Sequence, residues 1–182
     1  IGVPGLFKSW RKGNVGILNA IGTGIADDKV VYSYVNKMIV YYLGEQPILN
    51  QVETYLCHEK IQRDYVIENI SKLVVKPANA SGGYGIMIGP KAPLKEREEV
   101  INKIKKNPRE FIAQPLEILS TAPTITENDI EPRHLDLRPF VLSGKTSYVT
   151  TGGLTRVALR KGSTIVNSSQ GGGSKDTLIV DM

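Results

Sequence analysis

The sequence lacks the features of a disulfide-stabilised or membrane-spanning protein. It has one cysteine, Cys57, so it cannot form an internal disulfide, which fits a reducing compartment, and we expect a cytoplasmic location. Apolar stretches such as LVV and FVL are interrupted within a few residues, so no run is long enough to cross a bilayer. Cys57 is followed directly by His58, but adjacent side chains seldom face each other. We therefore interpret Cys57 as structural and not as a nucleophile.

The first residues, IGVPGLFKSWRKGN, contain neither an initiator methionine nor an apolar core followed by a small-residue cleavage site. The last residues, DTLIVDM, stop just after an apolar run. We expect the polypeptide to continue at both ends, and substrate contacts to lie partly outside this segment.

The composition is that of an ordinary globular domain, with 182 residues, 41% hydrophobic and 23% charged. The formal charge of +5 arises from 23 basic and 18 acidic residues and favours either nucleic acid or a phosphorylated small molecule as a partner. The densest basic run, Lys103, Lys105 and Lys106, lies on an expected amphipathic helix that also carries glutamates. No aromatic side chain interleaves with these lysines to stack on bases, so nucleic acid is the weaker alternative.

Helical and extended segments alternate along the first half of the chain. NVGILNAIG predicts a buried strand, and Asp27 is a good N-cap for the helix that follows. Apolar residues recur at helical spacing from Val30 to Tyr42, and Gly44 is expected to end that helix. We interpret its aromatic stripe as core.

From about residue 70 the pattern changes to short strands and turns, including KLVVKP, GYGIMIG and REFIAQPLEI. LDLRPFVL and KTSYVTT flank an expected turn at Ser143 and Gly144, and LTRVAL follows an expected turn at Gly152 and Gly153. STIVN then leads into a glycine cluster. The pattern predicts an α+β fold with antiparallel sheet.

The segment VVKPANASGGYGI carries the clearest chemical signal. A strand ends in Lys76, passes through a loop of small residues and returns as a strand at Ile86. Such a loop lets backbone N–H groups approach an anion, because Ser81, Gly82, Gly83 and Gly85 carry little or no side chain. The segment is neither a Walker motif nor a dinucleotide fingerprint.

This segment resembles the lysine and glycine-loop motif of the ATP-grasp superfamily, and further motifs follow in the matching order. ADDK resembles the motif that supplies a first phosphate lysine, and FIAQPLE the hinge strand beside adenine. DLRPFVL, GGLTRVAL and IVNSSQGGG resemble the DLR strand, the strand of a catalytic arginine and the asparagine metal segment. The amino-acid sequences of these motifs are most similar to those of the circularly permuted ATP-grasp type 2 family, which is related to glutathionylspermidine synthetase-like amide ligases.

The resemblance implies an ATP-grasp fold with mixed or antiparallel sheets, flanking helices and a nucleotide held between two subdomains. We expect three segments: an N-terminal strand and helix segment at 1–60, a glycine-loop subdomain at 61–115, and a catalytic and metal-binding sheet at 116–182. The implied cofactors are ATP and Mg²⁺.

The resemblance also assigns the residues that contact ATP. Lys29 and Lys76 would hold the α and β phosphates, and the glycine loop would cover them. Gln114 stands in a region where a glutamate is common, yet either side chain can accept a hydrogen bond from the adenine amino group. Backbone groups of Pro115, Leu116 and Glu117 would supply the remaining contacts. The expected walls of the adenine site are Leu73, Val75, Ile86 and Ile112. The alternative for these four residues is ordinary core.

In an extended LDLRPFVL strand, Asp136 and Arg138 point to the same face. Asp136 is then a candidate Mg²⁺ ligand, and Arg138 and Arg156 are candidates to neutralise the transferring γ-phosphoryl group. A cross-strand ion pair is the alternative for these charges.

Asn167 is the second candidate metal ligand, with a turn residue as its alternative. Many relatives in the resembling family have a glutamate two positions earlier, where this chain has Ile165. Glu117, Glu131 or a residue beyond the chain would have to compensate, and the sequence does not choose among them. His134 is interpreted as an exposed loop residue.

The predicted function is that of an ATP-dependent carboxylate–amine ligase that forms an amide through an acylphosphate. Its partners would be a small-molecule carboxylate and amine, with no membrane and with nucleic acid as the weaker alternative. Two alternatives are an ATP-binding module that has lost ligase activity and a basic nucleic-acid-binding domain.

Overall fold

The computed structural model describes residues 3–19, 21–80, 82–127, 129–164, 166 and 172–178. It divides into two compact units. Unit 1 comprises residues 1–79 and 86–115, and unit 2 comprises residues 80–85 and 116–182. The glycine loop therefore groups with the second unit, although both flanking strands belong to the first.

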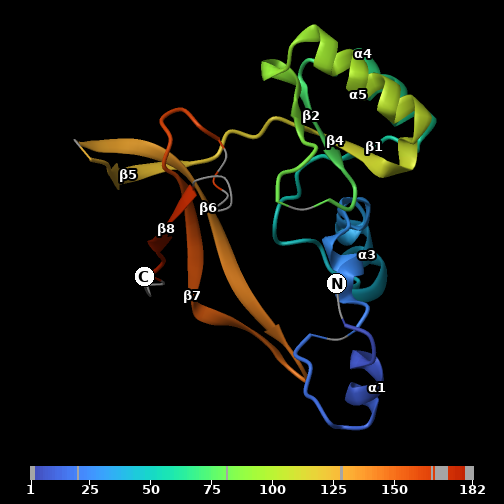
Figure 1. The fold of residues 1–182 in the computed structure, drawn as a ribbon, viewed down its shortest axis with the longest axis vertical. Coiled ribbons are helices and arrows are strands. Elements are labelled where there is room, and N and C mark those ends of the chain that lie inside the picture. The colour runs from blue at the N-terminus through green and yellow to red at the C-terminus, as the bar shows by residue number, and fades with distance from the viewer. Residues whose placement is uncertain are drawn as a thin grey trace. The chain divides into compact units, whose positions relative to one another are not determined.

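Unit 1 is built on an antiparallel sheet with the strand order β1-β4-β2-β3. Its strands are β1 (Tyr55–Leu56), β2 (Leu73–Pro77), β3 (Met87–Ile88) and β4 (Phe111–Pro115). The helices α4 (Lys60–Glu68) and α5 (Leu94–Lys106) lie on the same side of this sheet (Figure 1). Short 3₁₀ turns at Gly89–Lys91 and Pro108–Glu110 lead into α5 and β4.

The core of unit 1 lies between the sheet and these two helices. Leu73, Val75 and Ala113 contribute to it from the strands. Val66 enters from α4, and Ile104 enters from α5. Because successive side chains of a strand point to opposite faces, Val74 and Lys76 must face away from this core.

The sequence of α5 explains its position. Glu96 lies in the first turn and three lysines lie in the last turn, which is the arrangement that the helix dipole favours. Val100 and Ile104 are its buried residues, as the amphipathic pattern predicts. The lysine run therefore forms the solvated face of a packed helix.

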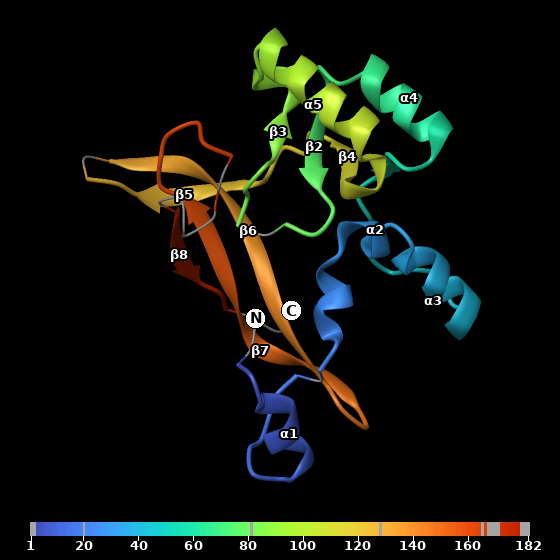
Figure 2. The same ribbon diagram turned by 45° about the vertical axis from the view of Figure 1, so that its right-hand side comes forward.

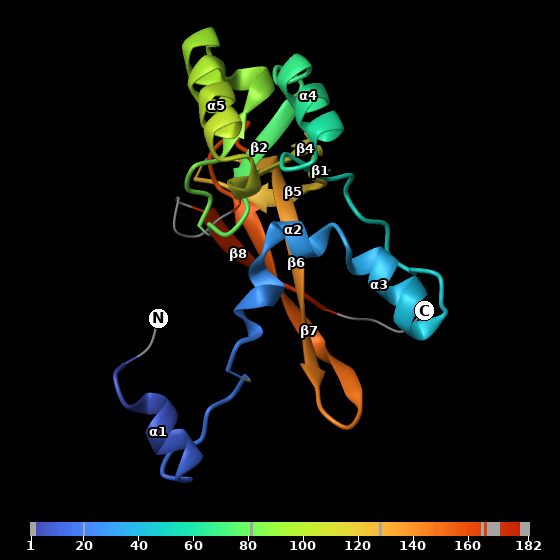
Figure 3. The same ribbon diagram turned by 90° about the vertical axis from the view of Figure 1, so that its right-hand side faces the viewer.

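The N-terminal part of unit 1 contains α1 (Leu6–Arg11), a 3₁₀ turn (Thr23–Asp27), α2 (Lys29–Tyr32) and α3 (Val35–Leu43). The predicted helix is thus present as two consecutive pieces, α2 and α3 (Figure 3). The expected end at Gly44 is confirmed, because this glycine adopts φ 68° as the C-cap. The expected N-cap was wrong by one residue, because Asp28 and not Asp27 accepts from the Val30 amide at 2.7 Å.

Two further predictions for this region were wrong. Residues 14–19 form bends and irregular backbone and not a buried strand. Gly13 and Asn19 have φ values of 74° and 72°, and such left-handed residues interrupt an extended segment. The stripe of α3 was expected to be core, yet α3 has no buried side chain among its described residues, and Met38 is 37% exposed.

Unit 2 is an antiparallel sheet with the order β5-β6-β7-β8. Its strands are β5 (Thr121–Ile125), β6 (Ile130–Ser143), β7 (Ser147–Ala158) and β8 (Gly172–Asp176). The strands β6 and β7 form a long hairpin, with β8 beside β7 (Figure 2). The predicted turn at Ser143 and Gly144 is confirmed, and all described strand pairs of both units are antiparallel.

The second predicted hairpin turn was wrong, because Gly152 and Gly153 lie within the continuous strand β7. Gly153 pairs with Pro139, and a side chain there would place its Cβ 2.9 Å from the carbonyl oxygen of Arg138. The glycine therefore permits a close approach of two strands, next to an irregularity in register between Pro139 and Val141. Part of the glycine cluster that follows STIVN is also a strand, since Gly172 begins β8.

Candidate anion site and charged strand pair

Lys76 and Gln114 form the centre of the candidate site in unit 1. Their strands pair antiparallel, with Lys76 opposite Ile112 and Val74 opposite Gln114. Lys76 and Gln114 are thus diagonal neighbours on one face of the sheet. The Lys76 ammonium donates to Oε1 of Gln114 at 2.6 Å, and Gln114 Nε2 donates to Oγ1 of Thr54 at 2.8 Å.

The same register separates the predicted adenine walls. Leu73 and Val75 belong to the core on the helix side of the sheet, so the core alternative holds for them. Ile112 is buried on the Lys76 face, where Val74 is its apolar neighbour on β2. Ile86 is 37% exposed.

Lys29 begins α2, and Asp28 caps this helix. The Lys29 backbone amide donates to the carbonyl of Ala78 at 3.0 Å, and its ammonium lies 3.5 Å from the same oxygen. Ala78 follows β2 directly, so this contact brings Lys29 to the end of the strand that carries Lys76.

The positive charge of Lys29 affects the pKa of Lys76. Burial lowers the pKa of the half-buried Lys76 below its ordinary value, and the positive charge of Lys29 lowers this pKa further. Two cations held near each other attract an anion. The structure therefore brings together the two lysines that the motifs assign to phosphate.

The glycine loop has the backbone conformation that small residues allow. Gly82, Gly83 and Gly85 have φ values of 70°, 80° and 71°, a region that other residues rarely adopt. The fourth predicted loop residue, Ser81, lies outside the described residues. Contacts of this loop with phosphate stay a prediction.

The predicted hinge follows Gln114. Pro115 ends β4, and Leu116 and Glu117 come directly after it, where the chain passes from one unit into the other. Glu117 is exposed. The assignment of these three residues to adenine stays a prediction.

Unit 2 holds the predicted catalytic charges. Asp136 and Arg156 are directly opposite each other on β6 and β7. Arg156 Nε donates to one carboxylate oxygen of Asp136 at 2.8 Å, and its Nη2 donates to the other oxygen. The hydrogen bonds and charge of Arg156 lower the pKa of Asp136, and the carboxylate raises the pKa of Arg156. The cross-strand ion pair expected as the alternative is therefore present.

Arg138 lies two residues beyond Asp136 on the same strand, so the predicted shared face is confirmed. Its side chain is exposed, and its charge also lowers the pKa of Asp136. Asp176 on β8 pairs with Leu154, which pairs with Arg138, so this face of the sheet presents two guanidinium groups and two carboxylates. Guanidinium groups bind phosphoryl oxygens well, so Arg138 and Arg156 remain the candidates for that contact.

The described residues do not by themselves make a complete magnesium site. Within the described ranges no three His, Cys, Asp or Glu side chains cluster as metal ligands. Both oxygens of Asp136 bind Arg156, and Glu131 is occupied by Arg133 and Lys161. Asn167, the other predicted ligand, lies outside the described residues. Asp136 could bind a metal only through the lone pairs that its bonds to Arg156 leave, or after giving up part of that contact.

Two other sequence predictions are settled by burial. Cys57 is fully buried, and burial raises the pKa of its thiol to about 11, so it is a neutral core residue as expected. His134 was expected in an exposed loop, but it lies half-buried in β6 with Nδ1 2.7 Å from the carbonyl of Leu119.

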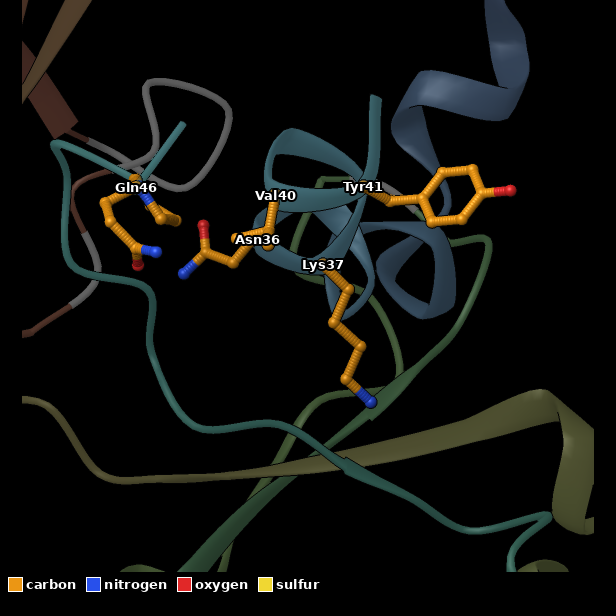
Figure 4. Close-up of a pocket in the computed structure, with 6 residues that line it drawn as sticks. Asn36, Lys37, Val40, Tyr41 and Gln46 are labelled. Carbon is orange, nitrogen blue, oxygen red and sulfur yellow. The ribbon is translucent and has the colours of Figure 1, made fainter. Parts of the chain in front are cut away.

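A separate hollow of about 550 Å³ lies beside α3. Asn36 and Gln46 extend their amide groups toward each other there, and Tyr41 lies farther along the helix (Figure 4). None of the predicted ATP-binding residues lines this hollow.

Sequence reasoning missed Thr54. This residue immediately precedes β1 and is 60 positions from Gln114, whose amide it contacts. A lone threonine next to a two-residue strand carries no motif. The contact becomes visible only through the pairing of Tyr55 with Ala113.

The combination of helices and antiparallel sheets is consistent with a domain of the ATP-grasp class. The chain belongs to the circularly permuted ATP-grasp type 2 family, whose model matches residues 1–158. In the described part of the chain, no helix has the length and apolar character needed to span a membrane.

The chain is 55% identical to an uncharacterized protein of Synechocystis sp. over 181 residues, covering 99% of this chain and 38% of that protein. It is 52% identical to an uncharacterized protein of Mycobacterium tuberculosis, covering 99% and 33%. It is 50% identical to a Frankia casuarinae protein named "Putative glutamate--cysteine ligase 2-2", covering 98% and 21%. The chain thus spans well under half the length of each of these relatives.

Proposed function

We propose that this chain is the nucleotide-binding part of an ATP-dependent ligase that joins a carboxylate to an amine. The observation that carries the proposal is the convergence of Lys29 on the strand end of Lys76, within a family defined by ATP-grasp motifs. Ligase activity is also in the name of the Frankia casuarinae relative. That name makes glutamate and cysteine the first substrate pair to test.

In the proposed reaction, a carboxylate oxygen of the acid attacks the γ-phosphorus of ATP, and ADP leaves. The product is an acylphosphate. The amine nitrogen then attacks the carbonyl carbon, inorganic phosphate leaves, and the amine gives up a proton to solvent. No side-chain nucleophile is needed, because the protein positions the reactants and neutralises charge.

The roles of the side chains follow from their charges. Lys29 and Lys76 would hold phosphate oxygens of ATP through charge-assisted hydrogen bonds. Arg138 and Arg156 would face the transferring γ-phosphoryl group. Arg138 is exposed and so accessible to it. Arg156 would have to bind it while also bonded to Asp136. ATP-grasp families generally use ATP with Mg²⁺. We assign no step to the metal, since the described residues give it no complete ligand set.

The test is to incubate the full-length protein with Mg-ATP, glutamate and hydroxylamine, and to measure ADP and the glutamyl hydroxamate. Hydroxylamine traps an acylphosphate, so a ligase should release ADP and form hydroxamate in equal amounts, and only when an accepted acid is present. Cysteine in place of hydroxylamine should then give the dipeptide amide. A panel of other amino acids and dicarboxylic acids covers different acid substrates.

The rival function is an ATP-binding module without ligase activity. The specific observation that favours it is the ion pair at Asp136, in which both carboxylate oxygens already accept from Arg156. ATP binding without acid-dependent ADP release over the whole panel would support this rival and refute the ligase. Absence of ATP binding would refute both.

A further inference from the structure

We infer that Gln114 is a positioning residue for Lys76, fixed by Thr54, and does not recognise the adenine amino group. This inference deepens the proposed function, because it assumes that Lys76 binds phosphate. It rests on a chain of hydrogen bonds in unit 1 that starts at Lys76.

The orientation of the Gln114 amide follows from its neighbours. A lysine ammonium has only donors, so the atom that it contacts at 2.6 Å must be the amide oxygen. The NH₂ group of Gln114 then faces Thr54, whose Oγ1 accepts at 2.8 Å. Thr54 Oγ1 uses its own hydrogen to donate to the carbonyl of Val52 at 3.0 Å. A flipped amide would lose the bond from Lys76, and it could keep Thr54 only by taking the hydroxyl hydrogen away from the Val52 carbonyl.

The chain of bonds continues to the helix that carries the other lysine. The Val52 amide donates to the phenolic oxygen of Tyr32 at 3.0 Å, and Gln51 Nε2 donates to the Tyr32 carbonyl. Tyr32 is the last residue of α2, and Lys29 is its first. The network therefore connects both lysine-bearing elements through groups that lie far apart in the sequence.

Burial makes this network consequential. Gln114 is 8% exposed, so its amide has little water to replace a lost partner. Lys76 carries a charge disfavoured by burial and by Lys29, and its ammonium donates to the Gln114 oxygen. If that oxygen turned to adenine, Lys76 would lose the contact that fixes its ammonium. We therefore assign the Gln114 oxygen to orienting the Lys76 ammonium toward phosphate.

Thr54→Val tests the inference, because valine has the same shape and lacks the hydroxyl. It leaves the Gln114 NH₂ group without its acceptor, which should release the amide and misplace Lys76. We expect the Kd of the full-length protein for ATP and for ADP to rise about tenfold, the size of one unsatisfied buried hydrogen bond. The Kd for adenosine should stay within about twofold, because adenosine has no phosphate to sense Lys76.

Inosine triphosphate separates the two roles of Gln114. Inosine carries an oxygen where adenine carries its amino group, so a residue that reads that amino group would discriminate the two nucleotides. We expect Thr54→Val to weaken both triphosphates by the same factor. A loss confined to ATP, with inosine triphosphate unaffected, would overturn the inference and return Gln114 to adenine.

Thr54→Ser and Thr121→Val are the matched controls. Serine keeps the hydroxyl and should restore ATP affinity to within about twofold of the wild type. Thr121 is an exposed threonine on β5 of unit 2, and its substitution should change nothing. Unfolding is monitored for each variant, and equal losses for adenosine and ATP would show a general structural defect and contradict the inference. If the wild-type protein itself binds no ATP, the proposed function fails first.

Discussion

Lys76→Met should weaken ATP binding while leaving the fold intact. Methionine has similar length and is apolar, so it removes the positive charge and keeps most of the packing. Burial already disfavours the charge of Lys76, and so does Lys29. The substitution relieves both effects, but it leaves Oε1 of Gln114 without its donor. These opposing changes should nearly cancel, and we expect the melting temperature to shift by about 4 °C or less.

Binding should change far more than stability. A charge-assisted hydrogen bond is worth about 1.5 to 3 kcal/mol, which corresponds to roughly a 10- to 150-fold rise in the Kd for ATP. The assay is calorimetric titration of the full-length protein with Mg-ATP, with adenosine as a ligand that should be unaffected. Lys72→Met is the matched control, because Lys72 is exposed and precedes β2 by one residue.

One result would refute the reasoning. If the folded Lys76→Met variant binds ATP with the wild-type Kd, Lys76 does not contact phosphate, and the convergence of the two lysines has another cause. An equal loss in Lys72→Met would instead show that general positive charge, and not the position of Lys76, attracts the nucleotide.

Three further predictions concern charge, pH and packing. Asp136→Asn should keep the Kd for ATP within about threefold but lower acid-dependent ADP release at least tenfold. The reason is that it removes the carboxylate that orders Arg156. ADP release at the wild-type rate would exclude this role of Asp136. ATP affinity should fall as the pH rises through the lowered pKa of Lys76, since the charged form binds phosphate. ATP titrations at several pH values should show this fall in affinity for the wild type but not for Lys76→Met. Gly89→Ala should destabilise the protein by about 1 to 3 kcal/mol in denaturant unfolding, because its Cβ would lie 2.0 Å from the Ile70 carbonyl oxygen, and an unchanged midpoint would contradict this.

The parts of the fold that the sequence predicts well are those with strong local periodicity. The α5 stripe and the turn at Ser143 and Gly144 are set by neighbours a few residues away, so their patterns survive without tertiary information. The glycines at 152 and 153 show the opposite case. They resemble a turn locally, but the close approach of Arg138 from the neighbouring strand decides their conformation.

The candidate site divides in the same way. The motifs place Lys29 and Lys76 at phosphate, and the structure brings them to one strand end through the Ala78 carbonyl. Thr54 carries no pattern, because its contact depends on which strands are neighbours in the sheet. Strand order depends on residues far apart in the sequence. A residue such as Thr54, whose contact depends on that order, therefore cannot be identified from sequence motifs.

The side chain at position 114 shows why this distinction matters for function. A glutamate there would accept from an adenine amino group as well as a glutamine does, so adenine recognition gives no reason for the neutral residue. Next to Lys76 the two differ, because a carboxylate would pair with the ammonium and cancel the charge that phosphate needs. A neutral amide holds the ammonium through one oxygen and leaves its net charge intact. In this chain, the glutamine therefore leaves Lys76 with more net positive charge for phosphate than a glutamate at the same position would.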